Sequence, residues 1–91
     1  MNTSPNKNSK ENLKEQKEHT CSLILHNDDI NTFEYIIESL IEICHHDPYQ
    51  ASQCAVLAHY KGACEIKHGI KDELYQLQNY FNDKNIYVTI E

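Results

Sequence analysis

One apolar stripe in the first half of the chain constrains the fold most strongly. Its members recur at offsets 0, 3, 4, 7, 8 and 11, and they are Phe33, Ile36, Ile37, Leu40, Ile41 and Cys44. This spacing predicts an α-helix with one face that another element has to cover. Asn31 or Thr32 can cap its start, and with Asn31 as the cap, Glu34 stands at the third helical position of a capping box.

A second helix is indicated by its two ends. Asp47 can act as the N-cap before Pro48 at the first helical position, and Gly62 provides a natural stop. Between them the helical spacing 0, 3, 4, 7 is occupied by small residues, namely Ala51, Cys54, Ala55 and Ala58. The inner face of this helix is therefore expected to leave space beside it.

Three strands and a third helix complete the pattern. Residues 21–25 (CSLIL) form a short apolar run that the polar HNDDIN ends, and 63–68 (ACEIKH) reads as another strand. A third helical stripe consists of Ile70, Leu74, Leu77 and Phe81, and the last strand alternates Ile86, Val88 and Ile90 with Tyr87 and Thr89. The order β-α-α-β-α-β predicts an α+β fold, a small sandwich of a three-stranded antiparallel sheet packed on three helices, with the strand order left open.

The chain divides into a polar beginning and an apolar-patterned remainder. Residues 1–20 contain Leu13 as their only strong apolar side chain besides Met1, so we expect a flexible, disordered N-terminal tail. Residues 21–91 are expected to form a single small domain. The tail carries four Lys and three Glu, so of the total charge of −6 the domain holds −6 − 1 = −7.

Composition argues against several classes of partner. The chain has no Arg and only eight scattered Lys, so the basic surface of a nucleic-acid binder is missing. No apolar run is long enough for a membrane span, and the N-terminus lacks the apolar core of a secretory signal, so we expect a cytoplasmic protein. Its four cysteines, Cys21, Cys44, Cys54 and Cys64, are then expected to be reduced thiols that pack as small hydrophobes.

Polar residues at one junction suggest a binding site. Asn27, Asp28 and Asp29 follow the first strand, and such residues are common in turns for their local backbone hydrogen bonds alone. The alternative is a cluster of acceptors for a cation, an ammonium group being a better candidate than Ca²⁺ because the loop lacks a glycine turn. His59, beside the small-residue face of the second helix, could be an ordinary hydrogen-bonded residue or a third acceptor through its neutral imidazole.

Metal and enzyme sites are weakly supported. The cluster Cys44, His45, His46, Cys54, His59 and Cys64 lacks the paired ligand spacing of structural zinc sites. No nucleophile elbow or phosphate-cradling glycine loop is present. We therefore expect a binding module, not an enzyme, without a metal or cofactor.

Four sequence motifs together carry a family resemblance. LILHNDD, EYIIESL, AHYKG and the closing YVTIE occur in the order and at the approximate spacing of the ClpS adaptors of the Clp protease, and the resemblance covers about residues 21–91. It implies a monomeric adaptor that recognises proteins by a bulky N-terminal Leu, Phe, Tyr or Trp. Such an adaptor hands them to a hexameric Clp AAA+ unfoldase, which it contacts through the unfoldase's N-terminal domain.

The resemblance also implies site residues. Those that would hold the substrate's α-amino group are Asn27, Asp28 and His59. Those that would line the pocket for the first side chain are Asn31, Phe33, Ile36, Ala55, Ala58 and Ile86.

Five positions depart from the family pattern. Phe33 stands where a methionine guards the pocket, and Ala55 and Ala58 replace larger aliphatic residues, which suggests a pocket of altered shape. Lys67 replaces a common glycine, and Leu77 replaces a lysine associated with unfoldase contact. Two other interpretations stay open: a small acidic interaction module that does not read N-termini, and a metal-binding protein that uses the Cys and His cluster.

Overall fold

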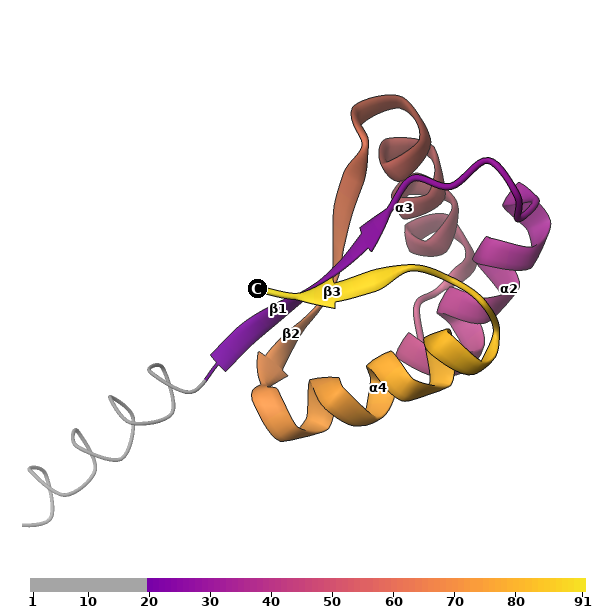
Figure 1. The fold of residues 1–91 in the computed structure, drawn as a ribbon. Helices are drawn as coiled ribbons and strands as arrows, with labels where there is room; N and C mark the ends of the chain where they lie inside the picture. Colours follow the sequence, from indigo (N-terminus) through magenta and orange to yellow (C-terminus); the bar gives the residue numbers. More distant parts are fainter. Residues whose placement is uncertain (1–19) are drawn as a thin grey trace, which may run out of the picture.

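Strands and helices follow one another along the chain in the order that the sequence predicts. A computed structural model describes residues 20–91. Its elements are β1 (Thr20–His26), α2 (Phe33–Cys44), α3 (Pro48–Lys61), β2 (Ala63–Ile70), α4 (Lys71–Asp83) and β3 (Val88–Ile90) (Figure 1). The predicted α+β class and the order β-α-α-β-α-β are confirmed.

The sheet has the strand order β2-β1-β3, which the sequence left open. Both pairings are antiparallel, so β1 lies in the centre, with Leu23 opposite Lys67 on one side and Ile90 on the other. The register with β2 shifts between Leu23 and Ile24, where the partner strand contains one additional residue, Ile66. This central position holds the end of β1, where the polar turn begins, between both neighbours.

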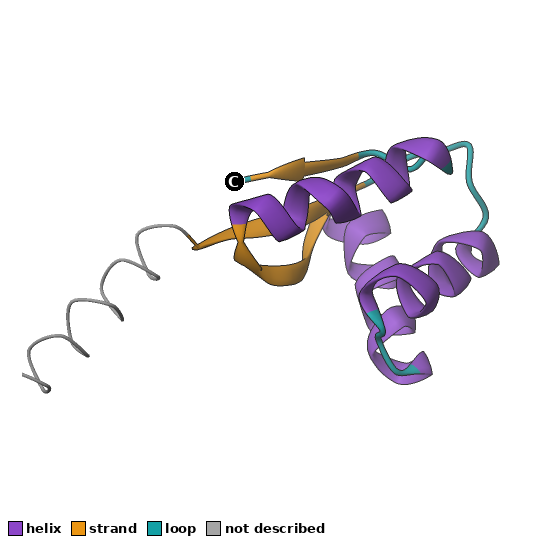
Figure 2. Ribbon diagram, turned by 90° about the horizontal axis from the view of Figure 1, so that it is seen from below, coloured by secondary structure: helices purple, strands orange, loops and turns teal. Residues whose placement is uncertain are grey.

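One face of the sheet is covered by helices. Leu23 and Leu25 on β1 are buried, and Leu74 and Phe81 of α4 belong to the same core. Figure 2 shows α4 running along the strands, with α2 and α3 grouped together beyond it. A sheet with one covered face needs apolar residues on that face alone, which explains the alternation of buried and partly exposed residues in β1.

The helix ends follow local capping rules. The N-cap of α2 is Thr32, whose hydroxyl accepts a hydrogen bond from the Tyr35 N–H at 3.1 Å, and Asn31 is not the cap. Asp47 caps α3 as predicted by accepting from the Gln50 N–H at 2.8 Å. Gly62 ends α3 with φ of 94°, a left-handed conformation that glycine adopts without strain.

Three predicted boundaries need correction. Ile70 is not part of the third helix: it ends β2, precedes α4 and is 43% exposed. Ile86 precedes the last strand, which begins only at Val88, and it is almost completely buried. The expected tail, residues 1–20, lies outside the described residues except for Thr20, which begins β1.

The helices of the described segment are short. None between residues 20 and 91 combines the length and the apolar character needed to cross a bilayer.

Candidate functional site

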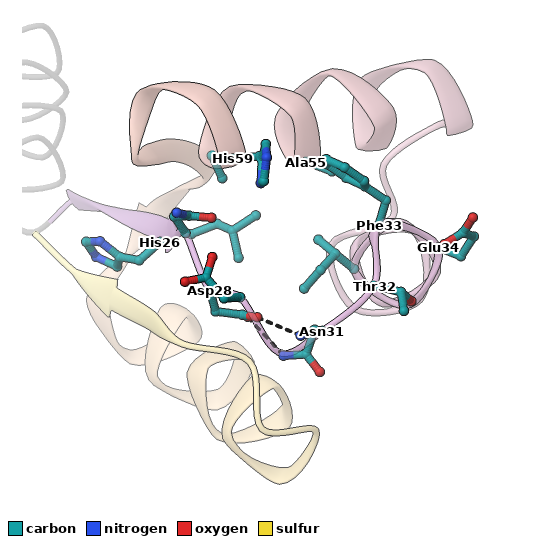
Figure 3. Close-up of a pocket in the computed structure, with 13 residues that line it drawn as sticks. His26, Asp28, Asn31, Thr32, Phe33, Glu34, Ala55 and His59 are labelled. Carbon is teal, nitrogen blue, oxygen red and sulfur yellow. Dashed lines mark hydrogen bonds between the residues drawn. The ribbon is translucent and has the colours of Figure 1, made fainter.

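A cavity of about 380 Å³ opens where β1, the following turn, α2 and α3 meet. Figure 3 shows the residues around it. The lining consists of Leu25, His26, Asn27, Asp28, Asp29, Asn31, Thr32, Phe33, Glu34, Ile36, Ala55, Ala58 and His59. Its volume lies within the usual range of small-ligand pockets, about 300 to 1,000 Å³.

The polar turn and the end of α3 are tied together by the backbone. The Asn27 N–H donates to the Gly62 carbonyl oxygen at 3.0 Å, directly after the last turn of α3. On the other side, the His26 N–H donates to the Tyr87 carbonyl oxygen at 3.1 Å. Asn27 is therefore fixed next to the helix end that carries His59.

Asp28 holds the turn and also faces the cavity. Its Oδ1 accepts from the N–H groups of Ile30 at 2.9 Å and Asn31 at 2.7 Å, and its Oδ2 accepts from Asn31 Nδ2 at 2.9 Å. Partial burial acts to raise the pKa of Asp28, but the hydrogen bonds from Asn31 and Ile30 outweigh it and lower the pKa below the ordinary value. The carboxylate is thus charged at neutral pH, and Oδ2, which accepts a single hydrogen bond, retains a lone pair for a further donor.

Asn31 connects the turn to a distant segment. Its Nδ2 donates both to Asp28 Oδ2 and to the carbonyl oxygen of Asn85, at 3.0 Å. Asn85 itself has a left-handed backbone, with φ of 62°. Asn31 therefore links the Asp28 carboxylate to the backbone that follows α4, and this link fixes the orientation of the carboxylate. Figure 3 shows Asp28 and Asn31 facing each other.

His59 lies in the last turn of α3 and is held by aromatic neighbours. Its ring meets Phe33 edge-on, with centroids 5.1 Å apart at 64°, and Tyr60 at 4.7 Å and 89°. Within residues 20–91 no hydrogen bond to its imidazole nitrogens is formed, so a nitrogen lone pair is available to a ligand. Ring packing orients His59 without using its acceptor.

The other side of the cavity is apolar, and α3 contributes only small side chains to it, Ala55 and Ala58. Leu25, Ile36, Ala55 and Ala58 are all buried. Figure 3 shows the Phe33 ring reaching from the start of α2 toward Ala55 on α3. Phe33 is 41% exposed, so it forms an edge of the cavity instead of joining the core as its place in the apolar stripe predicted.

Among residues 20–91, the charged residues that line this cavity are all acidic. They are Asp28, Asp29 and Glu34, and no Lys of this segment lines it. An acidic, partly apolar cavity with acceptors at one end suits a ligand that combines an ammonium group with an apolar side chain.

Eight of the nine residues predicted for the site line this cavity. They are Asn27, Asp28, Asn31, Phe33, Ile36, Ala55, Ala58 and His59. Ile86 is not among the residues that line it, and its side chain is buried in the core. Asp29, which the sequence placed in the acceptor cluster with Asn27 and Asp28, also lines the cavity. The prediction missed Leu25, although its place in the alternation of β1 signals an inward side chain next to the turn, and it also missed His26, Thr32 and Glu34.

The Cys and His residues that could have formed a metal cluster do not lie together, because His59 lines the cavity described above and others line a different one. A second cavity of about 410 Å³ is lined by Cys44, His45, His46, Gln50, Glu65, Ile66, Lys67 and His68. His46 is buried there, and its Nε2 lies 2.7 Å from the Ile66 carbonyl oxygen. In the described part of the chain, no three His, Cys, Asp or Glu side chains are grouped so that they could hold a metal ion.

Comparisons with known proteins point to one family. The family model described as "ATP-dependent Clp protease adaptor protein ClpS" matches residues 16–85. A solved structure of Agrobacterium tumefaciens ClpS2 bound to L-phenylalaninamide is similar in fold, with a TM-score of 0.70 and 15% sequence identity over 80% of this chain and 95% of that chain. No curated protein sequence matches the chain.

Proposed function

This chain belongs to the ClpS family of ATP-dependent Clp protease adaptor proteins, and we propose that it binds proteins through a bulky hydrophobic N-terminal residue and delivers them to a Clp unfoldase. The N-terminal residues that it would accept are Leu, Phe, Tyr and Trp. The observation that carries this proposal is the two-sided cavity, with acceptors at one end and an apolar wall at the other.

The acceptor end matches the chemistry of a free α-amino group. An α-ammonium has three N–H donors and a pKa of about 7.7 to 8.0, so it is largely charged at neutral pH. Removing it from water requires converging acceptors, which Asn27, Asp28 and His59 would supply. An internal peptide bond has no such group, so this end of the cavity would select for a chain terminus.

The apolar end would hold the first side chain. Burying a Leu or Phe side chain contributes roughly 1.5 to 3 kcal/mol, which by itself gives only weak binding. Ile36, Ala55 and Ala58 would contact this side chain, and Phe33 would close over it. The amine and the side chain must therefore act together, so short or charged first residues would bind poorly. The structure of Agrobacterium tumefaciens ClpS2 with L-phenylalaninamide supports this proposal, because that ligand combines a free amine with an aromatic side chain.

The shape of the apolar end would set the preference among bulky residues. Phe33 is a rigid ring, and it is fixed by its edge contact with His59. Ala55 and Ala58 leave space on the opposite wall. We expect this combination to change the order of affinity for Leu, Phe, Tyr and Trp relative to a cavity with methionine at the position of Phe33.

Delivery would require contact with the N-terminal domain of a hexameric AAA+ unfoldase. Leu77, at the family position associated with that contact, is partly buried against the core of this protein and has no charge. A lysine is therefore absent where the resemblance implies one. Contact with the unfoldase would depend on other surfaces, including the acidic residues Asp72 and Glu73 in the first turn of α4.

The proposal is tested in two steps. In the first step, fluorescence anisotropy compares labelled peptides that begin with Phe, Leu, Tyr or Trp with otherwise identical peptides that begin with Gly or Asp. In the second step, a folded reporter protein beginning with Phe is degraded by a Clp unfoldase and protease with and without this chain. Selective binding with faster degradation supports the proposal, whereas binding indifferent to the first residue would leave only a general interaction module.

A further inference from the structure

Two cysteines meet where α3 and β2 pack together. Cys54 lies on the buried side of α3, and Cys64 is the second residue of β2. Both sulfur atoms approach one backbone atom, the Glu65 carbonyl oxygen, which is 4.0 Å from Cys54 Sγ and 3.5 Å from Cys64 Sγ. Both residues are free thiols, and neither lines the cavity between β1, α2 and α3.

We propose that Cys54 and Cys64 form an oxidant-responsive dithiol, which a low-molecular-weight disulfide such as oxidised glutathione converts to an intramolecular disulfide between α3 and β2. This proposal rests on the contact that both sulfur atoms make with one atom, the Glu65 carbonyl oxygen. The bond would close a short loop that contains Gly62, the C-cap of α3. Figure 1 shows this turn, where α3 leads into β2. The proposed dithiol does not depend on the proposed function.

The different exposure of the two thiols assigns the order of steps. Cys64 is partly exposed, whereas Cys54 is 7% exposed. The Cys64 thiolate attacks one sulfur of oxidised glutathione, whose S–S bond breaks and releases one glutathione thiolate. The Cys54 thiolate then attacks the sulfur of Cys64 and displaces the second glutathione. Two cysteine thiols are oxidised, one glutathione disulfide is reduced to two thiols, and the two released thiolates take up the two protons.

The environment of Cys54 agrees with its role as the second nucleophile. Burial raises its pKa, and the adjacent Cys64 thiol raises the pKa further, to about 12. A thiol of this kind reacts slowly with dissolved oxidants. It reacts mainly with a sulfur that is already held next to it.

The test uses the full chain, reduced, desalted and then incubated with excess oxidised glutathione near the ordinary thiol pKa, at about pH 8.5. We expect the free-thiol count to fall by two and peptide mapping without reduction to show a Cys54–Cys64 link. We also expect the melting temperature to rise by about 10 °C, because the bond restricts the unfolded chain, and to return after dithiothreitol.

Matched variants make the test specific. Cys64→Ser should abolish both the link and the temperature shift, whereas Cys21→Ser, a change at another partly exposed cysteine, should retain both. Cys54→Ala, whose small side chain suits the small-residue face of α3, should also abolish the link and the temperature shift. A Cys44–Cys54 link, a persistent glutathione adduct on Cys64, disulfide-linked dimers as the main product, or four unreacted thiols would each overturn the proposal.

Discussion

Replacing His59 separates recognition of the amine from packing of the cavity. His59 is exposed, its aromatic contacts are with Phe33 and Tyr60, and its imidazole forms no hydrogen bond within residues 20–91. His59→Ala should weaken binding of a Phe-initiated peptide by about 1 to 3 kcal/mol, because one acceptor of a charged hydrogen bond is lost. This corresponds to a dissociation constant roughly 5 to 150 times higher, measured by fluorescence anisotropy.

Two further variants identify the physical cause. His59→Phe keeps an aromatic ring against Phe33 but has no acceptor, so it should lose as much affinity as His59→Ala. His59→Gln offers an amide oxygen and should lose less. Thermal unfolding of all three should stay close to that of the parent, because an exposed substitution in the last helical turn usually changes stability by less than about 0.5 kcal/mol. Parent-like affinity of His59→Phe would refute the role of the imidazole as an acceptor.

Three other changes test separate parts of the account. Phe33→Met should change the order of affinities for peptides beginning with Leu, Phe, Tyr and Trp, and four unchanged affinities would count against a role for the ring in preference. Asp28→Ala should lower the free energy of unfolding by about 1 to 2 kcal/mol in chemical denaturation, since the turn loses the acceptor of three hydrogen bonds. Because the folded pKa of Asp28 is lowered, its stabilising effect is present above the unfolded pKa, about 3.9, and is lost as the pH falls through the folded pKa. If the free energy of unfolding fell in the same way with decreasing acidic pH in the parent and in Asp28→Ala, this assignment would be contradicted. Deleting residues 1–19 should leave peptide affinity unchanged but slow reporter degradation, and weaker peptide binding would mean that the deleted segment contributes to the cavity.

Elements whose ends depend on neighbouring residues could be predicted from the sequence. Asp47, Pro48 and Gly62 define α3 through contacts within a few residues, so their residue types suffice. The stripe of α2 was also recognisable, although it could not show that Phe33 lies at the edge of a cavity. Its exposed position depends on how α2 and α3 meet, which is a tertiary property.

Features that depend on distant segments could not be read from the sequence. Asn31 was a reasonable cap for α2, but its side chain instead binds Asp28 and the carbonyl oxygen of Asn85, 54 positions away. Ile86 matched an alternating strand pattern, yet it is buried before β3 begins and does not line the cavity. The turn interpretation of Asp28 and the binding interpretation are compatible, because the same carboxylate holds the turn and faces the cavity.

The central claim is that the acceptor end of the cavity binds a free α-amino group. The most direct measurement is the affinity of one labelled Phe-initiated peptide, with its N-terminus either free or acetylated. Acetylation removes the charge and two of the three ammonium donors, so we expect the dissociation constant to rise at least about 100-fold. Equal dissociation constants for the two peptides, within about twofold, would contradict recognition of the amine.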